Sequence, residues 1–192
     1  ALVSGGIDWL AVYTVKEFRQ LRELGITCPI VILGHVPKDD LGYVIAKEGR
    51  LWGYGIEFLR EIQEISAAID KPAYIHLVIE TGMGRLGLYP EDIHLALDVI
   101  EKAPEMVLEG VTQHFSTADD SDPTYYRYQE RQFKQGLAVV LNKYSRESLI
   151  IHIQNSAGIM YQSSSIETDM IRSGAALYGL APNLSLQKHE IQ

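Results

Sequence analysis

Apolar and polar positions alternate along the chain with two different periods, which predicts strands alternating with helices. Residues 30–33 and 149–153 are almost continuously apolar, as is typical of parallel strands covered on both faces. Between such runs, apolar residues recur at helical spacing. We expect strands at 8–12, 29–33, 50–54, 72–80, 106–115 and 148–153, with a last strand-like stretch within 169–178. We expect helices at 14–24, 39–48, 57–69, 90–102, 123–144 and 156–162, with Asp39 or Asp40 capping the second.

About seven β units, each followed by a helix except the last, are compatible with a (β/α)8 barrel or an open doubly wound sheet. Polar or glycine-rich segments follow several strands, at 34–35, 81–85, 114–119, 155–156 and 172–174. A barrel builds its active site on all of these strand ends, whereas an open sheet uses one switch point. We therefore predict an incomplete (β/α)8 TIM-type barrel over 1–182 that lacks its first strand. Residues 183–192 are expected to form an exit segment.

The segment 74–88 contains the most distinctive local pattern. An apolar run ends at Glu80, and three glycines then surround Arg85. Their spacing matches the dinucleotide-binding fingerprint, but in that motif a helix opens among the glycines. Pro90 would break such a helix in its first turns. We therefore predict a loop that presents Arg85 to an anionic ligand oxygen. A surface turn with a solvated arginine is the plainer alternative.

Composition narrows the functional classes. The 17 basic and 25 acidic residues give a formal charge of −8, which argues against a nucleic-acid partner. No apolar run approaches the ~20 residues that span a bilayer, so we expect no membrane segment. The single cysteine, Cys28, allows no internal disulfide, is expected to be buried, and suits a cytoplasmic protein. Because the first residue is not methionine, we expect the chain to begin within a longer gene product.

Four motifs stand in a characteristic order. They are Thr-Gly-Met-Gly-Arg-Leu-Gly at 81–87, Gln-His-Phe-Ser-Thr-Ala-Asp at 113–119, His-Ile-Gln-Asn-Ser-Ala at 152–157 and Arg-Ser-Gly-Ala-Ala-Leu-Tyr-Gly at 172–179. Together they closely resemble the alanine racemases, which are pyridoxal 5'-phosphate enzymes built from a barrel and a C-terminal β domain. The resemblance implies a cytoplasmic homodimer that interconverts L- and D-alanine, a small amino-acid substrate, for peptidoglycan synthesis. It also implies that 183–192 lead toward a C-terminal β domain absent from this chain.

The resemblance assigns roles to two arginines. Arg172 would face the pyridine nitrogen of the cofactor, and His152 would hydrogen-bond Arg172. Because a guanidinium does not give up its proton, the pyridine nitrogen would stay unprotonated. The ring is then a weak electron sink, which favours simple return of a proton over transamination. Arg85 would meet the phenolic oxygen of the cofactor and the substrate carboxylate.

The remaining implied site residues surround the cofactor's ring and phosphate. His114 would lie against the ring face, and Asn155 would be a neighbour in the pocket. Ser156, with the backbone N–H groups of Gly174 and Ala175, resembles a phosphate cradle.

Without the resemblance, each of these residues has a plainer interpretation. His114 and His152 would be ordinary polar residues at strand ends. Asn155 and Ser156 would cap a helix, and Gly174 would occupy a turn.

Two departures from the family matter. Val78 stands where many relatives carry a lysine, modified to a carbamate that steadies the arginine. Both proton-transfer residues are also absent. The Schiff-base lysine would belong to a strand before Ala1, and the opposing tyrosine to the C-terminal domain, contributed across the dimer interface. We therefore expect no catalytic residue in this chain, which alone would be inactive and bind pyridoxal phosphate weakly and non-covalently.

Three alternatives stay open at this point. A serine or broad-specificity racemase would share the same motifs, and so would a non-catalytic pyridoxal-phosphate-binding barrel. A metal-dependent barrel hydrolase could use His76, His114, His152 and Asp169. However, His76 lies several residues before the end of its strand, over ~10 Å from the rim, so we expect no metal site.

Overall fold

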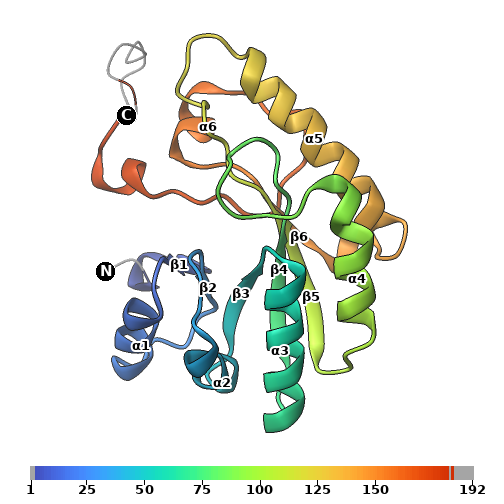
Figure 1. Cartoon of the computed structure of the whole chain (residues 1–192). Helices are drawn as coiled ribbons and strands as arrows, with labels where there is room; N and C mark the ends of the chain where they lie inside the picture. Colours follow the sequence, from blue (N-terminus) through green and yellow to red (C-terminus); the bar gives the residue numbers. More distant parts are fainter. Residues whose placement is uncertain (1–2, 182, 184–192) are drawn as a thin grey trace. The chain divides into compact units, whose positions relative to one another are not determined.

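The computed structural model describes residues 3–181 and residue 183, and six parallel strands occur within them. They are β1 Leu10–Val12, β2 Ile30–Ile32, β3 Gly49–Gly53, β4 Ala73–Val78, β5 Met106–Thr112 and β6 Ile150–His152 (Figure 1). Their order in the sheet is their order in the chain, β1-β2-β3-β4-β5-β6. A doubly wound sheet reverses its strand order at a switch point. The observed order is that of a barrel-type α/β fold, so the predicted fold class is confirmed.

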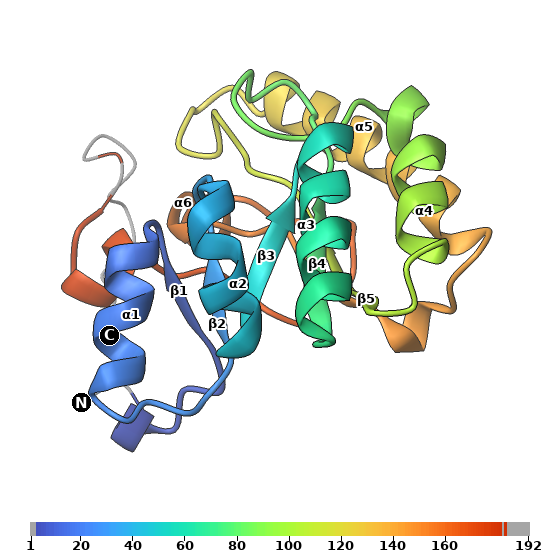
Figure 2. The ribbon, with the colours of Figure 1, turned by 60° about the horizontal axis from the view of Figure 1, so that its bottom comes forward.

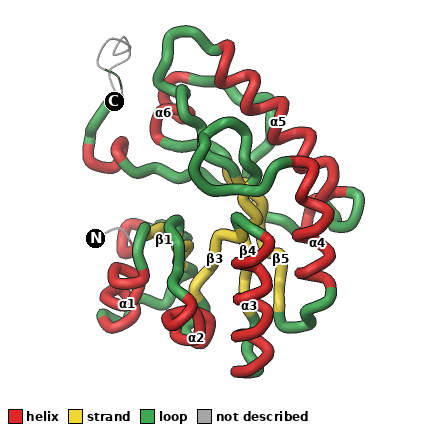
Figure 3. Tube along the Cα trace, in the orientation of Figure 1, coloured by secondary structure: helices red, strands yellow, loops and turns green. Residues whose placement is uncertain are grey.

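A helix follows every strand, as parallel pairing requires (Figure 3). The α-helices are α1 Val15–Glu23, α2 Lys38–Ala46, α3 Ile56–Ile69, α4 Ile93–Glu101, α5 Thr124–Leu141 and α6 Ser156–Tyr161. Short 3₁₀ turns are η1 Val3–Gly5, η2 Pro90–Asp92, η3 Arg146–Ser148 and η4 Ala175–Tyr178. In the described part of the chain, no helix is long and apolar enough to cross a membrane.

The chain forms two compact units. The first unit comprises residues 1–77 and 94–109. In it, α1 packs on β1 and β2, while α2 and α3 pack on each other and on β3 (Figure 2). All three residues of β2 are buried, which fits a strand covered on both faces. The core of this unit is therefore the one that the apolar runs predict.

Local sequence determines where the helices of the first unit begin. Thr14 and Glu17 form a capping box, because the Thr14 hydroxyl accepts from the Glu17 N–H and the Glu17 carboxylate accepts from the Thr14 N–H. The predicted cap of α2 by Asp39 or Asp40 is wrong. The helix begins at Lys38 after Pro37, and both aspartates lie in its first turn. There they interact favourably with the helix dipole without capping the helix.

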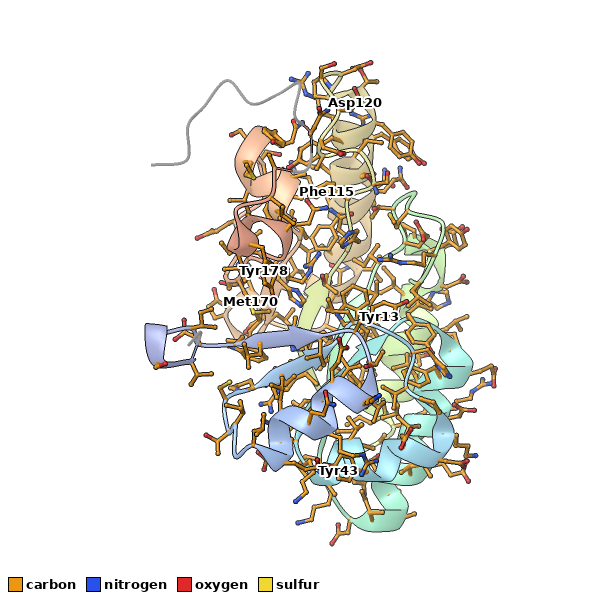
Figure 4. The ribbon with its side chains drawn as sticks, turned by 90° about the vertical axis from the view of Figure 1, so that its left-hand side faces the viewer. Tyr13, Tyr43, Phe115, Asp120, Met170 and Tyr178 are labelled. Atoms are coloured by element: carbon orange, nitrogen blue, oxygen red, sulfur yellow. The ribbon has the colours of Figure 1, made fainter. Side chains whose placement is uncertain are left out.

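The second unit comprises residues 78–93 and 110–192. Phe115, just after β5, stacks on Tyr126 of α5 with ring centroids 4.1 Å apart. Phe115 and Asp120, which mark the segment from β5 toward α5, are labelled in Figure 4. A Cβ added at Gly136 would lie 2.7 Å from Ile93 and 2.9 Å from Ile79, so α5 approaches its neighbours closely at this glycine. α5 therefore packs closely against Ile79 and Ile93, which precede and follow the glycine loop.

Three expectations differ from the structure in detail. The strand expected within 169–178 is only an isolated parallel bridge between Asn155 and Arg172. The N–H groups of Asp169 and Arg172 donate to the carbonyls of Ile151 and Gln154, while the Ile151 N–H donates to the Asp169 side chain. The helix expected from residue 90 opens as the 3₁₀ turn η2, and Cys28 is half-buried instead of buried. Of the expected exit segment, residues 184–192 lie outside the described residues.

Candidate functional site

All of the residues proposed for the site from sequence belong to the second unit. Arg85 follows β4, and His114 follows β5. His152 ends β6, and Asn155 and Ser156 follow it. Arg172, Gly174 and Ala175 come from the segment that bridges back to Asn155. The candidate site is therefore built on the carboxyl ends of parallel strands, where barrel enzymes carry their active sites.

The guanidinium of Arg172 is enclosed by the ends of β5 and β6. Its Nη1 donates to the Thr112 hydroxyl at 2.9 Å and to the His152 carbonyl at 2.5 Å. Its Nη2 donates to the Gln113 carbonyl at 2.7 Å. Burial lowers the pKa of Arg172 to about 10. The group therefore stays protonated at neutral pH, and its orientation is fixed by backbone oxygens.

His152 is fully buried and lies against this arginine. Its Nδ1 is 2.9 Å from Nη1 of Arg172. A guanidinium can only donate, so Nδ1 must accept and the neutral ring carries its proton on Nε2. The hydrogen bond expected between the two residues is present. The neutral imidazole is therefore one more hydrogen-bond acceptor for the guanidinium of Arg172.

His114 is a neutral ring beside positive charge. Its Nδ1 is buried and has no hydrogen-bond partner among residues 3–181 and 183. Burial, followed by the charges of Arg172 and Arg85, lowers the pKa of His114 to about 4. The ring is therefore uncharged at neutral pH. Arg172, and Arg85 in the loop after β4, are thus near enough to His114 to disfavour its charged form.

Arg85 lies in the glycine loop, and its side chain is exposed. Its guanidinium makes no hydrogen bond to any residue that the structure describes. The backbone of its loop, by contrast, is tightly bound. The Glu80 carboxylate accepts from four consecutive backbone N–H groups, those of residues 82–85. Val78, below the loop, is buried and purely aliphatic.

The structure brings Ser156 against the backbone of 174–176, and the phosphate cradle of Ser156, Gly174 and Ala175 stays a prediction. The Ser156 hydroxyl accepts from the N–H of Gly174 at 3.0 Å and of Ala176 at 3.3 Å, and not from that of Ala175. Asn155 caps α6, because its side chain accepts from the Gly158 N–H at 2.9 Å. Its side-chain amide also donates to the Phe115 carbonyl at 3.1 Å. The plainer interpretation of Asn155 as a helix cap thus holds, and its cap also ties β6 to the segment after β5.

A polar network that the sequence did not indicate supports these strand ends. The buried Gln129 of α5 donates to the Thr81 hydroxyl and to the His114 carbonyl, both at 3.1 Å. Thr81 in turn donates to the Gln113 side chain at 2.7 Å. Gln113 is in a recognised motif, and Thr112 ends an apolar strand with a polar residue. Gln129 gives no such signal, because it is one polar residue on a long amphipathic helix.

The residues of the alternative hydrolase are engaged elsewhere. His76, in the first unit, is 3.0 Å from the Glu109 carboxylate. Asp169 accepts from the Ile151 N–H and pairs with Arg146. Within the described ranges, no group of three or more His, Cys, Asp or Glu side chains could hold a metal ion. The hydrolase hypothesis thus has no geometric support from the residues it names.

The strand order and the polar cluster at the strand ends define a barrel-type α/β protein with a candidate ligand site on its rim. Residues 1–182 match the family model described as alanine racemase, N-terminal domain. The chain belongs to this family, as the four motifs predicted.

Individual relatives agree with this membership. The chain is 36% identical over 189 residues to alanine racemase 2 of Caldanaerobacter subterraneus subsp. tengcongensis, covering 98% of this chain and 48% of the relative. It is 34% identical to the alanine racemase of Methanococcus maripaludis, covering 98% of this chain and 50% of the relative. The solved alanine racemase of Clostridium difficile 630 superposes with a TM-score of 0.89 at 30% identity. The superposition covers 97% of this chain and 48% of the solved chain. The chain thus spans about half the length of the relatives it matches.

Proposed function

We propose that this chain is the cofactor-binding part of a pyridoxal-phosphate-dependent amino-acid racemase, with alanine as the substrate. The observation that carries the proposal is Arg172, held by backbone oxygens and by Nδ1 of a neutral His152 at the strand ends. Relatives named alanine racemase supply the reaction class. By the same family membership, we propose a cytoplasmic homodimer that supplies D-alanine for peptidoglycan.

The chemistry of the described residues fits a planar, phosphorylated pyridine. Arg172 keeps its proton at neutral pH, so it would donate to the ring nitrogen and leave that nitrogen unprotonated. The uncharged imidazole of His114, with its buried and unbonded Nδ1, suits an aromatic ring face. The Ser156 hydroxyl and the N–H groups of Gly174 and Ala175 would hold the phosphate, and the hydrogen bonds of Ser156 bring its hydroxyl to this segment.

These assignments give the cofactor and the residues around it different roles in the reaction. Pyridoxal phosphate, when bound, withdraws electrons from the substrate and acidifies its α proton. Arg172 limits that withdrawal, which favours return of the proton to the same carbon. Arg85 would orient the substrate carboxylate and the cofactor's phenolic oxygen by charge-assisted hydrogen bonds. The lysine and tyrosine that carry the proton in the family have no counterpart at matching positions here, so we propose that this chain binds cofactor but does not racemise by itself.

Titration of the 192-residue chain with pyridoxal phosphate, followed by induced circular dichroism of the cofactor, tests this proposal. We expect weak saturable binding that Arg172→Ala weakens at least about tenfold, because a charge-assisted hydrogen bond contributes ~1.5–3 kcal/mol. Arg60→Ala is the matched control, since Arg60 is an exposed arginine on α3 of the first unit. Equal affinities of the wild type and Arg172→Ala would contradict the assignment. Steady L/D-alanine interconversion by this chain, or covalent cofactor on one of its lysines, would contradict the proposed division of labour.

A further inference from the structure

The loop that carries Arg85 is closed at its neck by main-chain hydrogen bonds. The Leu88 N–H donates to the Val78 carbonyl at 2.8 Å, and the Glu80 N–H donates to the Leu88 carbonyl at 2.8 Å. Ile79 and Leu88 form an isolated parallel bridge at the same level. In Figure 3 this segment is the long stretch of loop that follows β4. The two ends of the loop are therefore held together by the main chain.

The interior of the loop is filled by one carboxylate. Oε1 of Glu80 accepts from the N–H groups of Gly82 and Met83 at 2.5 and 2.6 Å. Its Oε2 accepts from the N–H groups of Gly84 and Arg85 at 3.0 and 3.3 Å. The Glu80 residue is only 7% exposed, so its carboxylate is largely removed from water. Consecutive N–H groups that converge on an anion form a nest, and here the anion is part of the chain itself.

The glycines make this arrangement possible. Gly82 and Gly84 have φ of 118° and 69°, which turn successive N–H groups inward and which other residues rarely adopt. Gly87 also has a positive φ, and a Cβ there would lie 2.7 Å from the Glu80 nitrogen. Tyr125 of α5 adds an outer tie by donating to the Gly82 carbonyl at 2.9 Å. The glycine motif thus serves to wrap main chain around Glu80.

The side chain of Arg85 has no comparable support from residues 3–181 and 183. Val78 is buried and its side chain is aliphatic, so that side chain cannot accept a hydrogen bond from the guanidinium. We propose that Glu80 is the positioning residue for Arg85, and that it acts through the loop backbone in place of a side-chain partner at position 78. This inference rests on the proposed function of Arg85 toward the cofactor and the substrate carboxylate. It makes the order of the loop, and not a contact to the guanidinium, the factor that places the charge.

Limited trypsin cleavage after Arg85 measures the order of the loop directly. Glu80→Gln keeps the shape but loses the charge, and it replaces one acceptor oxygen by an N–H donor. We expect cleavage after Arg85, relative to cleavage after the exposed Lys102, to become about tenfold faster. Amide hydrogen exchange at 82–85 should accelerate in parallel. Glu91→Gln, an exposed glutamate of η2 in the same unit, is the matched control and should behave as wild type.

Glu80→Asp keeps the carboxylate and distinguishes anchoring from general loss of fold. We expect it to stay within about threefold of the wild-type cleavage rate, since its carboxylate still accepts two or more of the amides. Wild-type cleavage and exchange in Glu80→Gln would overturn the proposal. So would cleavage in Glu80→Asp as fast as in Glu80→Gln, because the anchor would then not be the charge.

A double-mutant cycle with Arg85→Ala tests whether Glu80 acts through Arg85. We expect Glu80→Gln to weaken pyridoxal phosphate binding in the wild-type background and to have no further effect once Arg85 is removed. Equal weakening in both backgrounds would overturn the positioning role. If Glu80→Gln loosens the loop while Arg85→Ala leaves cofactor affinity unchanged, the anchor is upheld and the proposed function of Arg85 fails.

Discussion

Each unit of the chain contains an enclosed arginine, and the two arginines have different hydrogen-bond partners. In the first unit, Arg50 makes a bidentate pair with Glu109, with Nε 3.0 Å and Nη2 3.1 Å from its oxygens. In the second unit, the hydrogen bonds described for Arg172 go to carbonyl oxygens, a hydroxyl and an imidazole nitrogen. The first arrangement pairs the charge with a carboxylate, whereas the hydrogen bonds of the second fix the direction in which the guanidinium points.

The difference separates a charge held in an ion pair from one whose orientation is set by groups at the strand ends. A buried charge without compensation is costly, so a fold that needs only stability pairs it. The neighbourhood of Arg50 is consistent with this, since His76 also contacts Glu109 and the guanidinium lies over the Tyr74 ring, 4.4 Å from its centroid. The hydrogen-bond partners described for Arg172, by contrast, fix its orientation at the ends of β5 and β6. This contrast supports the assignment of Arg172 to the cofactor.

The largest effect is expected from breaking the pair in the first unit. Glu109→Ala leaves Arg50 largely buried without its carboxylate, and we expect the free energy of unfolding to fall by about 3 kcal/mol. Urea denaturation measures this change. The exposed pair of Lys38 and Glu64 provides the control, and Glu64→Ala should cost less than about 1 kcal/mol. Equal effects of the two substitutions would show that burial of the first pair has no energetic consequence.

The next effect concerns the pH dependence of the second unit. The folded protein holds the pKa of His114 at about 4, below its ordinary value of 6.5, so the unfolded chain binds more protons between these values. Stability should therefore fall as pH is lowered through this window, by about 1–2 kcal/mol once partial exposure is allowed for. His114→Gln should flatten that part of the profile, as urea midpoints at several pH values would reveal. An unchanged profile would place His114 in a solvated setting.

The smallest effect compares two helix glycines, one in each unit. A Cβ at Gly42 of α2 would be 3.8 Å from its nearest neighbour, Ile65, whereas a Cβ at Gly136 of α5 would be 2.7 Å from Ile93. Gly42→Ala should raise the free energy of unfolding by about 0.5–1 kcal/mol. Gly136→Ala gains the same helix propensity but overpacks the core, so its net effect should be a loss of about 1 kcal/mol. Thermal melting of both variants checks the sign, and a stabilising Gly136→Ala would contradict the close packing of α5.

Much of the fold and the outline of the candidate site could be predicted from the chain alone. Strands and helices follow from apolar periodicity, which is a local property, so their order was predicted correctly. The rim segments could be located because polar sequence comes directly after apolar runs, and parallel strands carry such ends to one edge. The individual site residues within these segments came from the resemblance of the four motifs. The capping box of Thr14 and Glu17 is also local, because both of its residues lie within a stretch of four.

Only the tertiary structure shows which groups the buried arginines bind, because their partners are distant in the chain. Arg50 and Glu109 are 59 residues apart, as are Arg172 and the carbonyl of Gln113. No local pattern distinguishes the arginine that pairs with a carboxylate from the one that oxygens at the strand ends orient. The nest around Glu80 is local in sequence but depends on backbone angles that glycine permits without dictating. Residue periodicity determines which elements form, whereas compensation of buried charge is settled only when separate strands bring their ends together.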